Sequence, residues 1–404
     1  MSLESIVFGT KHFTDNQKQK APEAPIKKAP AWVDPDDLSL ISKPNEDSLQ
    51  EKYLKTVQHA DVSWSTKESN PKEVVDAVDL FSESPDRIPS DNLLIERVAD
   101  LYTPSTRSSV LGLVFNPCEP LAALLDSRGI VHVISVNGKN NKVQYSIPFP
   151  KQAQRHCLCY SSGGELIFVG CSKGTFHTID CRTQTSLLTK IPSSQENITA
   201  AYCSPNNKLL VLIAQNRVHF IETSNRILLK TVPTSDELHC GTFDDTGDFF
   251  IAAGQSGHGI IFDCATFTAI NRFQEPEMQF IHAIAFSHNR VAIGTDAGVL
   301  HVFDFQSLKE RHPRPLFTKL NLSTKVDTVK FNPTGELIVF ASSAKNNSLR
   351  ILHLASQKVF SNWPTQKAPL SEVKDAAFDA TGQYLAIGNE KGKATMWELS
   401  FYKK

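Results

Sequence analysis

Four histidines in the sequence have the residue type needed to bind a metal ion or to transfer protons. His132, His177, His219 and His301 each lie in a short apolar run, and each run belongs to a different repeat of the chain. Metal ligands must converge on one point, whereas repeat-equivalent positions are distributed around a structure. The spacing therefore indicates buried structural histidines rather than catalytic ones.

The eight cysteines offer a second possible chemistry, as metal ligands or nucleophiles. The sequence has no Cys-x-x-Cys pair, and its densest group is His156-Cys157-Leu158-Cys159. Two of these residues would share one face of a strand, but no further ligand follows at a spacing typical of zinc sites. We interpret the cysteines as reduced core residues of an intracellular protein.

The sequence also lacks the phosphate-binding motif Gly-x-x-x-x-Gly-Lys-Ser/Thr and the zinc-protease motif His-Glu-x-x-His. Asp180, Asp263 and Asp304 recur at equivalent positions of three repeats, which is typical of strand ends and turns rather than of acid–base catalysis. The sequence therefore predicts a protein that is not an enzyme and has no cofactor or metal.

Charge and hydropathy narrow the function classes further. The chain has 42 basic and 43 acidic residues, and a protein that binds nucleic acid by bulk electrostatics would be clearly basic. Any RNA contact is therefore expected to be local or to act through partners. Met1–Gly9 contains Glu4 and precedes no apolar run, so we predict neither a signal peptide nor a membrane helix.

Residues 1–90 differ in composition from the rest of the chain. They are rich in Pro, Lys, Asp, Glu and Ser, and they contain few apolar runs, so we expect a largely extended and mostly disordered N-terminal tail. Residues 48–64 are the exception, because Leu49, Tyr53, Leu54 and Val57 have roughly helical spacing. We expect a short helix there.

Residues 91–404 repeat one pattern seven times. An aromatic residue is followed by a turn, a strand of small apolar residues, a glycine or polar pair, and a β-branched strand that ends in an acidic residue. Successive aromatic anchors are 41 to 47 residues apart, which is the period of a four-stranded propeller blade. The anchors are Phe115, Tyr160, Tyr202, Phe243, Phe286, Phe331 and Phe378.

These repeats predict an all-β fold, a seven-bladed β-propeller of the WD40 type. One blade cannot bury both faces of its sheet, so the blades must stack and the ring must close. Few residues follow Leu399, so the last blade lacks a fourth strand of its own. We expect the run 93–98 to supply that strand and to protect the exposed sheet edge. Phe331 is expected to be fully buried, so that its replacement by alanine costs roughly 3–5 kcal/mol.

The C-terminal part has a more specific resemblance. Phe331–Pro333, Leu349–Leu354, Val359–Pro364 and Ala386–Lys393 are strings that blade periodicity alone would not generate. On these strings, residues 316–402 resemble the U3 small nucleolar RNA-associated protein 18 family, WD40-repeat subunits of the small-subunit processome.

The resemblance implies a non-catalytic scaffold in the nucleolus of the nucleus. It implies association with the U3 ribonucleoprotein particle and with other processome proteins, and a role in pre-rRNA processing and 18S rRNA maturation; direct contact with RNA stays open. Family members can carry a Leu-Phe-x-Val-Asp type motif that recruits the exosome helicase. Here Leu80-Phe81 continues as Ser-Glu, so we do not expect that recruitment.

Two groups of residues are candidates for partner binding. The N-terminal group consists of short apolar and Trp/acidic motifs that also resemble the family, and the C-terminal group comes from the family-like strings. The N-terminal candidates are Ile6, Val7, Phe8, Trp32, Asp34, Asp36 and Asp37, and the C-terminal candidates are Asn362, Trp363, Asn389, Glu390, Lys391 and Lys393.

A different function on the same fold remains an alternative, because a propeller does not determine what it binds. The protein would then be an interaction adaptor in another pathway, such as a substrate adaptor of a ubiquitin ligase. Recovery of U3 RNA with the tagged protein separates the two hypotheses.

Overall fold

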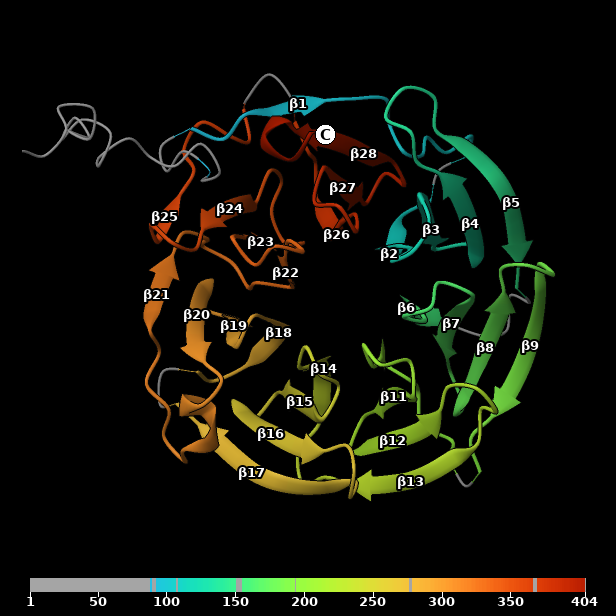
Figure 1. Ribbon diagram of the computed structural model, residues 1–404, viewed down its shortest axis with the longest axis vertical. Coiled ribbons are helices and arrows are strands. Elements are labelled where there is room, and N and C mark those ends of the chain that lie inside the picture. The colour runs from blue at the N-terminus through green and yellow to red at the C-terminus, as the bar shows by residue number, and fades with distance from the viewer. Residues whose placement is uncertain are drawn as a thin grey trace, which may run out of the picture. The chain divides into compact units, whose positions relative to one another are not determined.

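A computed structural model describes residues 88, 92–106, 108–149, 155–192, 194–275, 278–365 and 369–403. These residues fall within one compact unit, Glu83–Lys404. They form seven four-stranded antiparallel sheets arranged as a ring (Figure 1). The predicted seven-bladed β-propeller is therefore confirmed. Of the tail expected over residues 1–90, only residue 88 is described, so the tail and the helix expected at 48–64 lie outside the described residues.

Each of the first four blades is a meander whose strands follow one another from the inside of the ring to its rim. Blade 1 contains β2 (Val110–Phe115), β3 (Leu121–Asp126), β4 (Ile130–Ser135) and β5 (Lys142–Pro148). Blade 2 contains β6 (Arg155–Tyr160), β7 (Leu166–Cys171), β8 (Thr175–Asp180) and β9 (Thr185–Lys190). Blade 3 contains β10 (Ala200–Cys203), β11 (Leu209–Ala214), β12 (Arg217–Glu222) and β13 (Leu228–Pro233). Blade 4 contains β14 (Leu238–Phe243), β15 (Phe249–Gly254), β16 (His258–Asp263) and β17 (Thr268–Gln274).

The remaining blades keep this order until the last one. Blade 5 contains β18 (Ile281–Ser287), β19 (Arg290–Thr295), β20 (Val299–Asp304) and β21 (Phe317–Leu320), with the 3-10 turn η3 (Ser307–Lys309) before β21. Blade 6 contains β22 (Thr328–Phe331), β23 (Leu337–Ala341), β24 (Leu349–His353) and β25 (Lys358–Val359). Blade 7 contains β26 (Val373–Phe378), β27 (Tyr384–Asn389), β28 (Ala394–Leu399) and the N-terminal strand β1 (Ile95–Arg97), and η4 (Ser400–Tyr402) follows it.

A polar residue just after the inner strand organises the first turn of several blades. Asn332 Oδ1 accepts a hydrogen bond from the Leu337 amide, at 2.8 Å, and Asp379 Oδ1 accepts one from the Tyr384 amide, also at 2.8 Å. Gly335 and Gly382 complete these turns with φ values of 72° and 78°, where a Cβ would be strained. The repeated aromatic–polar–turn pattern of the sequence therefore has a local physical cause.

Two expectations about the aromatic anchors need correction. In blade 3 the inner strand ends at Cys203 and its turn begins at Ser204, so Cys203 rather than Tyr202 is equivalent to Phe331. The Tyr202 hydroxyl instead accepts a hydrogen bond from the Gly241 amide of blade 4, at 2.9 Å. Phe331 is only half-buried, because it ends its strand at the edge of the core between blades 5 and 6.

This placement changes the expected effect of substituting Phe331. Phe331→Ala is now expected to lower the free energy of unfolding by about 2 kcal/mol, whereas Phe340→Ala, in the middle strand β23 of the same blade, should lower it by about 4 kcal/mol. Phe340 has no exposed surface and packs in the same cluster, so it is the matched control. Denaturant unfolding of both variants tests whether Phe340→Ala is the more destabilising. An equal loss would show that the partial exposure of Phe331 does not reduce its contribution to stability.

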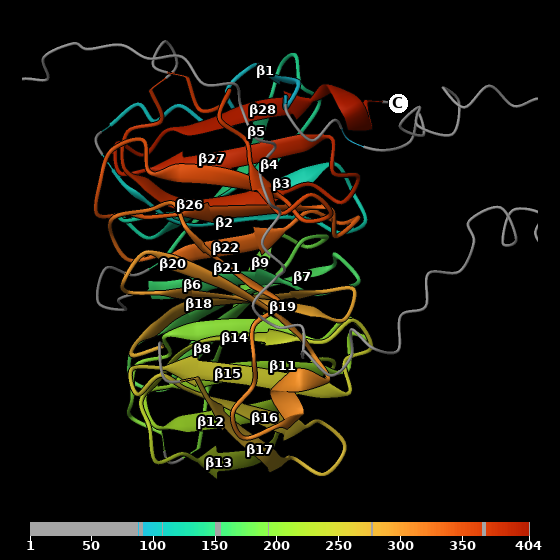
Figure 2. The same cartoon turned by 90° about the vertical axis from the view of Figure 1, so that its left-hand side faces the viewer.

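The core consists of seven apolar clusters, one at each junction between neighbouring blades. At the junction of blades 3 and 4, for example, Phe220 and Phe262 meet edge to face with ring centroids 6.0 Å apart. Each blade is thus buried by its two neighbours, and the side view in Figure 2 shows the strands of successive blades packed in parallel layers.

The four histidines lie in the third strands of blades 1, 2, 3 and 5, and all are buried. His132 Nδ1 lies 2.7 Å from Ser146 Oγ, and His219 Nδ1 lies 2.9 Å from Thr231 Oγ1, so two of the rings are bound to the fourth strand of their own blade. Burial lowers the pKa of His219 to about 4, which keeps its ring neutral at physiological pH. The histidines belong to separate blades, as expected from their spacing.

Candidate interaction surface

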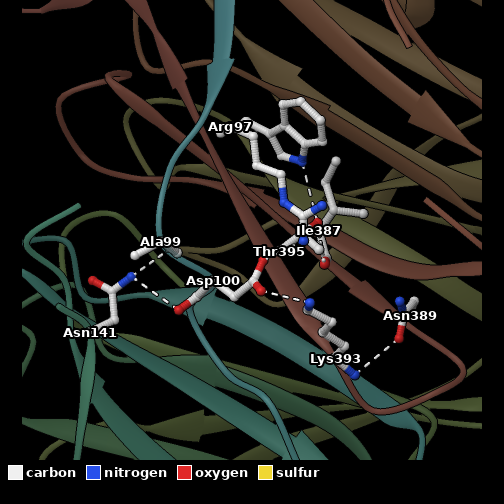
Figure 3. Close-up of polar contacts among 9 residues, drawn as sticks. Arg97, Ala99, Asp100, Asn141, Ile387, Asn389, Lys393 and Thr395 are labelled. Carbon is white, nitrogen blue, oxygen red and sulfur yellow. Dashed lines mark hydrogen bonds and ion pairs between the residues drawn. The ribbon is translucent and has the colours of Figure 1, made fainter. Parts of the chain in front are cut away.

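Four of the six described candidate residues make or support the contacts that hold the N-terminal segment 92–102, which crosses from blade 7 to blade 1. Strand β1 pairs with β28 through Ile95–Leu399, Glu96–Glu398 and Arg97–Trp397. Further along, the amide of Val98 donates to the Met396 carbonyl at 3.1 Å. Figure 3 shows the polar contacts made around this segment.

Asn362 and Trp363 hold the start of this segment. The Asn362 side chain donates to the Leu93 carbonyl at 2.8 Å and accepts from the Leu93 amide at 3.2 Å. Trp363 is 3% exposed and packs edge to face on Trp397, with ring centroids 5.1 Å apart. The hypothesis that Trp363 contacts a partner is therefore wrong, because its ring is inside the core between blades 6 and 7. The amide of Asn362 is likewise committed to the chain's own backbone.

Asn389 and Lys393 hold the other end of the segment. Asn389 is 6% exposed, and its Oδ1 accepts a hydrogen bond from the Lys393 amide at 3.0 Å, which closes the turn between β27 and β28. That turn places Lys393 Nζ 2.6 Å from Asp100 Oδ2 (Figure 3). Asn389 is thus a turn residue rather than a contact residue, and Lys393 is paired within the chain.

The contact with blade 1 was not predicted. Asn141 Nδ2 donates to the Ala99 carbonyl at 2.9 Å and to the Asp100 carbonyl at 3.3 Å (Figure 3), and the Ala99 amide donates to the Gly138 carbonyl at 3.3 Å. Asn141 and Ala99 are 42 positions apart in the chain, so no local pattern in the sequence indicates this contact. The loop that contains Gly138 and Asn141 therefore holds the segment 92–102 across the junction of blades 7 and 1.

The ion pair between Asp100 and Lys393 makes stability depend on pH. Burial alone would raise the pKa of Asp100, but hydrogen bonds from Lys393 and Arg97 outweigh it and hold the pKa below the ordinary 3.8. A carboxyl with a depressed folded pKa stabilises the fold above its unfolded pKa, and that contribution is lost as pH falls through the folded value. The contribution of Asp100 to stability is therefore lost only at acidic pH, below about pH 4.

We expect Asp100→Asn to reduce the free energy of unfolding at neutral pH by about 1 kcal/mol or less, as for a partly exposed pair. The difference from the unsubstituted protein should shrink as the pH is lowered through the acidic window, which denaturant unfolding at several pH values measures. Arg182→Met, which breaks the more exposed pair with Glu165, is the control and should have almost no effect. A constant difference across the pH range would contradict the role of the Asp100 charge.

Glu390 and Lys391 are exposed, and unlike the exposed Asn362 they make no hydrogen bond with the segment 92–102. They lie at the edge of a hollow of about 850 Å³ between blade 7 and the segment that enters blade 1. Hydroxyl side chains dominate its lining: Ser105, Thr106, Ser108, Ser109, Ser127 and Ser371. Its polar, open character is suited to contacts with another macromolecule rather than to enclosing a small substrate.

Glu390 also has a carboxylate neighbour in this hollow. Its hydrogen bond with Glu372 raises the pKa of Glu372, while Lys374, 3.6 Å away, opposes the rise. The hollow therefore presents acidic and basic groups side by side, with Lys391 at its edge. This surface, defined by Glu372, Glu390 and Lys391, is the candidate interaction surface.

Other reactive residue types have structural placements. Burial raises the pKa of Cys157 and of Cys240 to about 12, so neither thiol is a nucleophile at neutral pH. The pentapeptide Gly170–Gly174 has the Gly-x-Ser-x-Gly spacing of a nucleophile elbow, but it lies at the turn between β7 and β8 instead of between a strand and a helix. Within the described part of the chain, no three His, Cys, Asp or Glu side chains are grouped to hold a metal ion.

The candidates Ile6, Val7, Phe8, Trp32, Asp34, Asp36 and Asp37 lie outside the described residues, as does Leu80-Phe81. Among the helical residues that the structure does describe, no segment has the length and apolar character required to cross a membrane.

Comparison with known proteins identifies relatives of the chain. No protein-family model matches it. The U3 small nucleolar RNA-associated protein 18 homolog of Mus musculus is 25% identical over 424 residues, covering 93% of this chain and 76% of the mouse protein. The chain is related to the U3 small nucleolar RNA-associated protein 18 proteins. The Homo sapiens homolog is 26% identical over 305 residues, and the Saccharomyces cerevisiae protein of that name is 37% identical over 113 residues.

These relatives confirm the resemblance inferred from residues 316–402. Coverage differs between them, because the match takes in 74% of this chain but only 55% of the human homolog, and 28% of this chain and 19% of the yeast protein. The chain thus spans about half the length of the human relative.

Proposed function

We propose that the protein is a non-catalytic scaffold subunit of the small-subunit processome that supports U3-dependent pre-rRNA processing and 18S rRNA maturation in the nucleolus. The observation that carries the proposal is the relationship over most of the chain to proteins named for association with U3 small nucleolar RNA. A role in ribosome biogenesis follows from those names, and the scaffold role is our inference from the geometry.

The geometry supports a binding role in two ways. The four histidines of the third strands and the buried thiols pack within the blades, and loops and strand edges lie around the ring. Propellers of this kind contact partners through loops and rims, and the net charge of −1 favours protein-mediated or local contact with RNA over bulk attraction. We therefore propose other processome proteins as the main partners.

The partner-binding residues fall into two proposed groups. On the propeller we propose Glu390 and Lys391, which are exposed at the candidate interaction surface. In the N-terminal region we propose the motifs 6–8 and 32–37, with Trp32 as the residue that contributes most, because tryptophans dominate the energy of many interfaces. Extended segments can bind along large surfaces of an assembly.

Trp32→Ala tests the N-terminal part of the proposal. We expect recovery of U3 RNA with the tagged full-length protein to fall severalfold, while the melting temperature of the purified protein stays unchanged. Quantitative RNA detection after affinity purification and a thermal melt give the two readouts. A melting temperature lowered by several degrees would show that Trp32 is a core residue.

Absence of U3 RNA from the purified unsubstituted protein would overturn the processome proposal itself. Recovery of a ubiquitin ligase instead would support the adaptor alternative. Neither outcome would change the conclusion that the fold is a propeller, because the fold does not depend on the identity of the partner.

A further inference from the structure

A groove on the rim of the ring, between blades 3 and 4, combines apolar and arginine side chains. It has a volume of about 820 Å³ and lies between the outer strand β13 of blade 3 and the strands β16 and β17 of blade 4. Figure 1 shows these outer strands side by side at the lower edge of the ring. None of the candidate residues discussed above lines it.

The floor of the groove is apolar. Ile260 and Phe262 of β16 are buried beneath it, and Val232 of β13 closes the blade 3 side. The groove also has an exposed apolar side chain, because Ile270 of β17 lines it and is 56% exposed. Exposed apolar side chains gathered beside a concave surface mark a contact site more often than chance exposure does.

Basic side chains line the groove above this floor. Arg272 and Arg311 line the groove together with His258 and His312, and among its lining residues there is no carboxylate. Burial lowers the pKa of His258, so the arginines rather than this histidine carry the positive charge. Asp236 nearby pairs with Arg272 at 2.5 Å and so offsets one charge. Arg311 contributes its carbonyl to the Gln274 amide, at 3.1 Å, and its exposed side chain leaves a positive charge at the groove.

We propose that this groove binds a segment of a partner protein that carries acidic residues next to aliphatic ones. Aliphatic side chains would cover Ile270 and the floor above Ile260, and a carboxylate would pair with Arg311, because Arg272 is already paired with Asp236. Arginine is suited to this role, because its planar guanidinium binds a carboxylate through two parallel hydrogen bonds.

A protein segment fits the groove better than single-stranded RNA does. Non-specific binding of single strands relies on aromatic side chains on which bases stack. Phe262, the phenylalanine in the groove lining, has no exposed surface and is covered by its neighbours, and no Tyr or Trp lines the groove. The groove therefore has charges for an anion but no exposed Phe, Tyr or Trp ring on which bases would stack.

The test uses the full-length protein and four fluorescently labelled probes of equal length. They are a peptide of alternating Glu and Leu, its Gln/Leu and Lys/Leu counterparts, and single-stranded polyuridine. We expect the Glu/Leu peptide to bind at least tenfold more tightly than the other three probes, and to bind more weakly as the salt concentration rises.

Substitutions locate the site. Arg311→Glu and Ile270→Glu should each weaken binding of the Glu/Leu peptide about tenfold, which corresponds to about 1.4 kcal/mol. Both side chains are exposed, so neither substitution is expected to change the melting temperature. Arg182→Glu, an equal charge reversal at an exposed arginine of blade 2, is the matched control and should leave binding unchanged.

Three outcomes would overturn the proposal. The first is no binding of the Glu/Leu peptide, which would show that the groove does not bind such a segment. The second is equal binding of the Gln/Leu peptide, which would show that the basic groups do not contribute to binding. The third is binding that persists in both groove variants. Tight binding of polyuridine that Arg311→Glu abolishes would identify the groove as an RNA contact instead. None of these outcomes depends on whether U3 RNA is recovered with the protein.

Discussion

Replacing Trp363 by alanine is expected to lower the free energy of unfolding by about 3–5 kcal/mol, among the largest effects of any single substitution in the ring. The indole is 3% exposed and packs against Trp397 in the cluster that also contains Leu93. Its removal leaves a cavity at the junction where the chain's first strand meets its last blade. Denaturant unfolding monitored by circular dichroism measures the loss.

Trp363→Phe is the matched control. The indole Nε1 is buried and has no hydrogen-bond partner among the described residues, so phenylalanine forfeits packing volume but no hydrogen bond. We expect it to cost about 1 kcal/mol, well below the alanine variant. Equal losses for the two variants, or a near-neutral alanine variant, would place Trp363 outside the core and restore it as a surface residue.

A chain that starts at residue 103 is expected to lose the cooperative unfolding of the ring. It lacks β1, so the edge of β28 loses the partner that pairs with it at three positions. It also lacks Leu93 and Leu101, which are 4% and 2% exposed, so the apolar clusters on both sides of blade 7 open to water. An unpaired edge with exposed apolar surface favours association with other chains.

A chain that starts at residue 83 is the control, because it retains the whole compact unit. Size-exclusion chromatography and thermal melting compare the two. We expect the longer chain to be monomeric with one sharp transition, and the shorter chain to aggregate or to melt broadly. A monomeric shorter chain with an unchanged melting temperature would show that β1 does not close the ring.

The number of blades could be predicted from the sequence because its causes are local. The polar residue after an inner strand, such as Asn332 or Asp379, accepts a hydrogen bond from the amide five residues later, so the turn leaves a signature in its own repeat. Blade 3 shows the limit of this approach, since the aromatic Tyr202 lies one residue before the true equivalent, Cys203, and the pattern alone favours the aromatic residue.

The roles of the family-like strings could not be predicted, because their causes are distant in the chain. Asn362 binds Leu93, which is 269 positions earlier, and Trp363 is buried by β28. Within its own string, Trp363 is surrounded by polar and turn residues and so looks like an exposed aromatic residue. The groove on the rim could not be predicted for the same reason, because β13 and β17 contribute to it from two different repeats.

The pairing of β1 with β28 also sets the order of events during synthesis. About 300 residues separate the two strands, so the first strand of the ring leaves the ribosome long before the last one exists. At 5–20 residues per second the interval is on the order of tens of seconds. Throughout that time the segment 92–102 has no blade to complete, and the blades already made present an open end. A nascent-chain chaperone that holds this segment would therefore act before the ring can close.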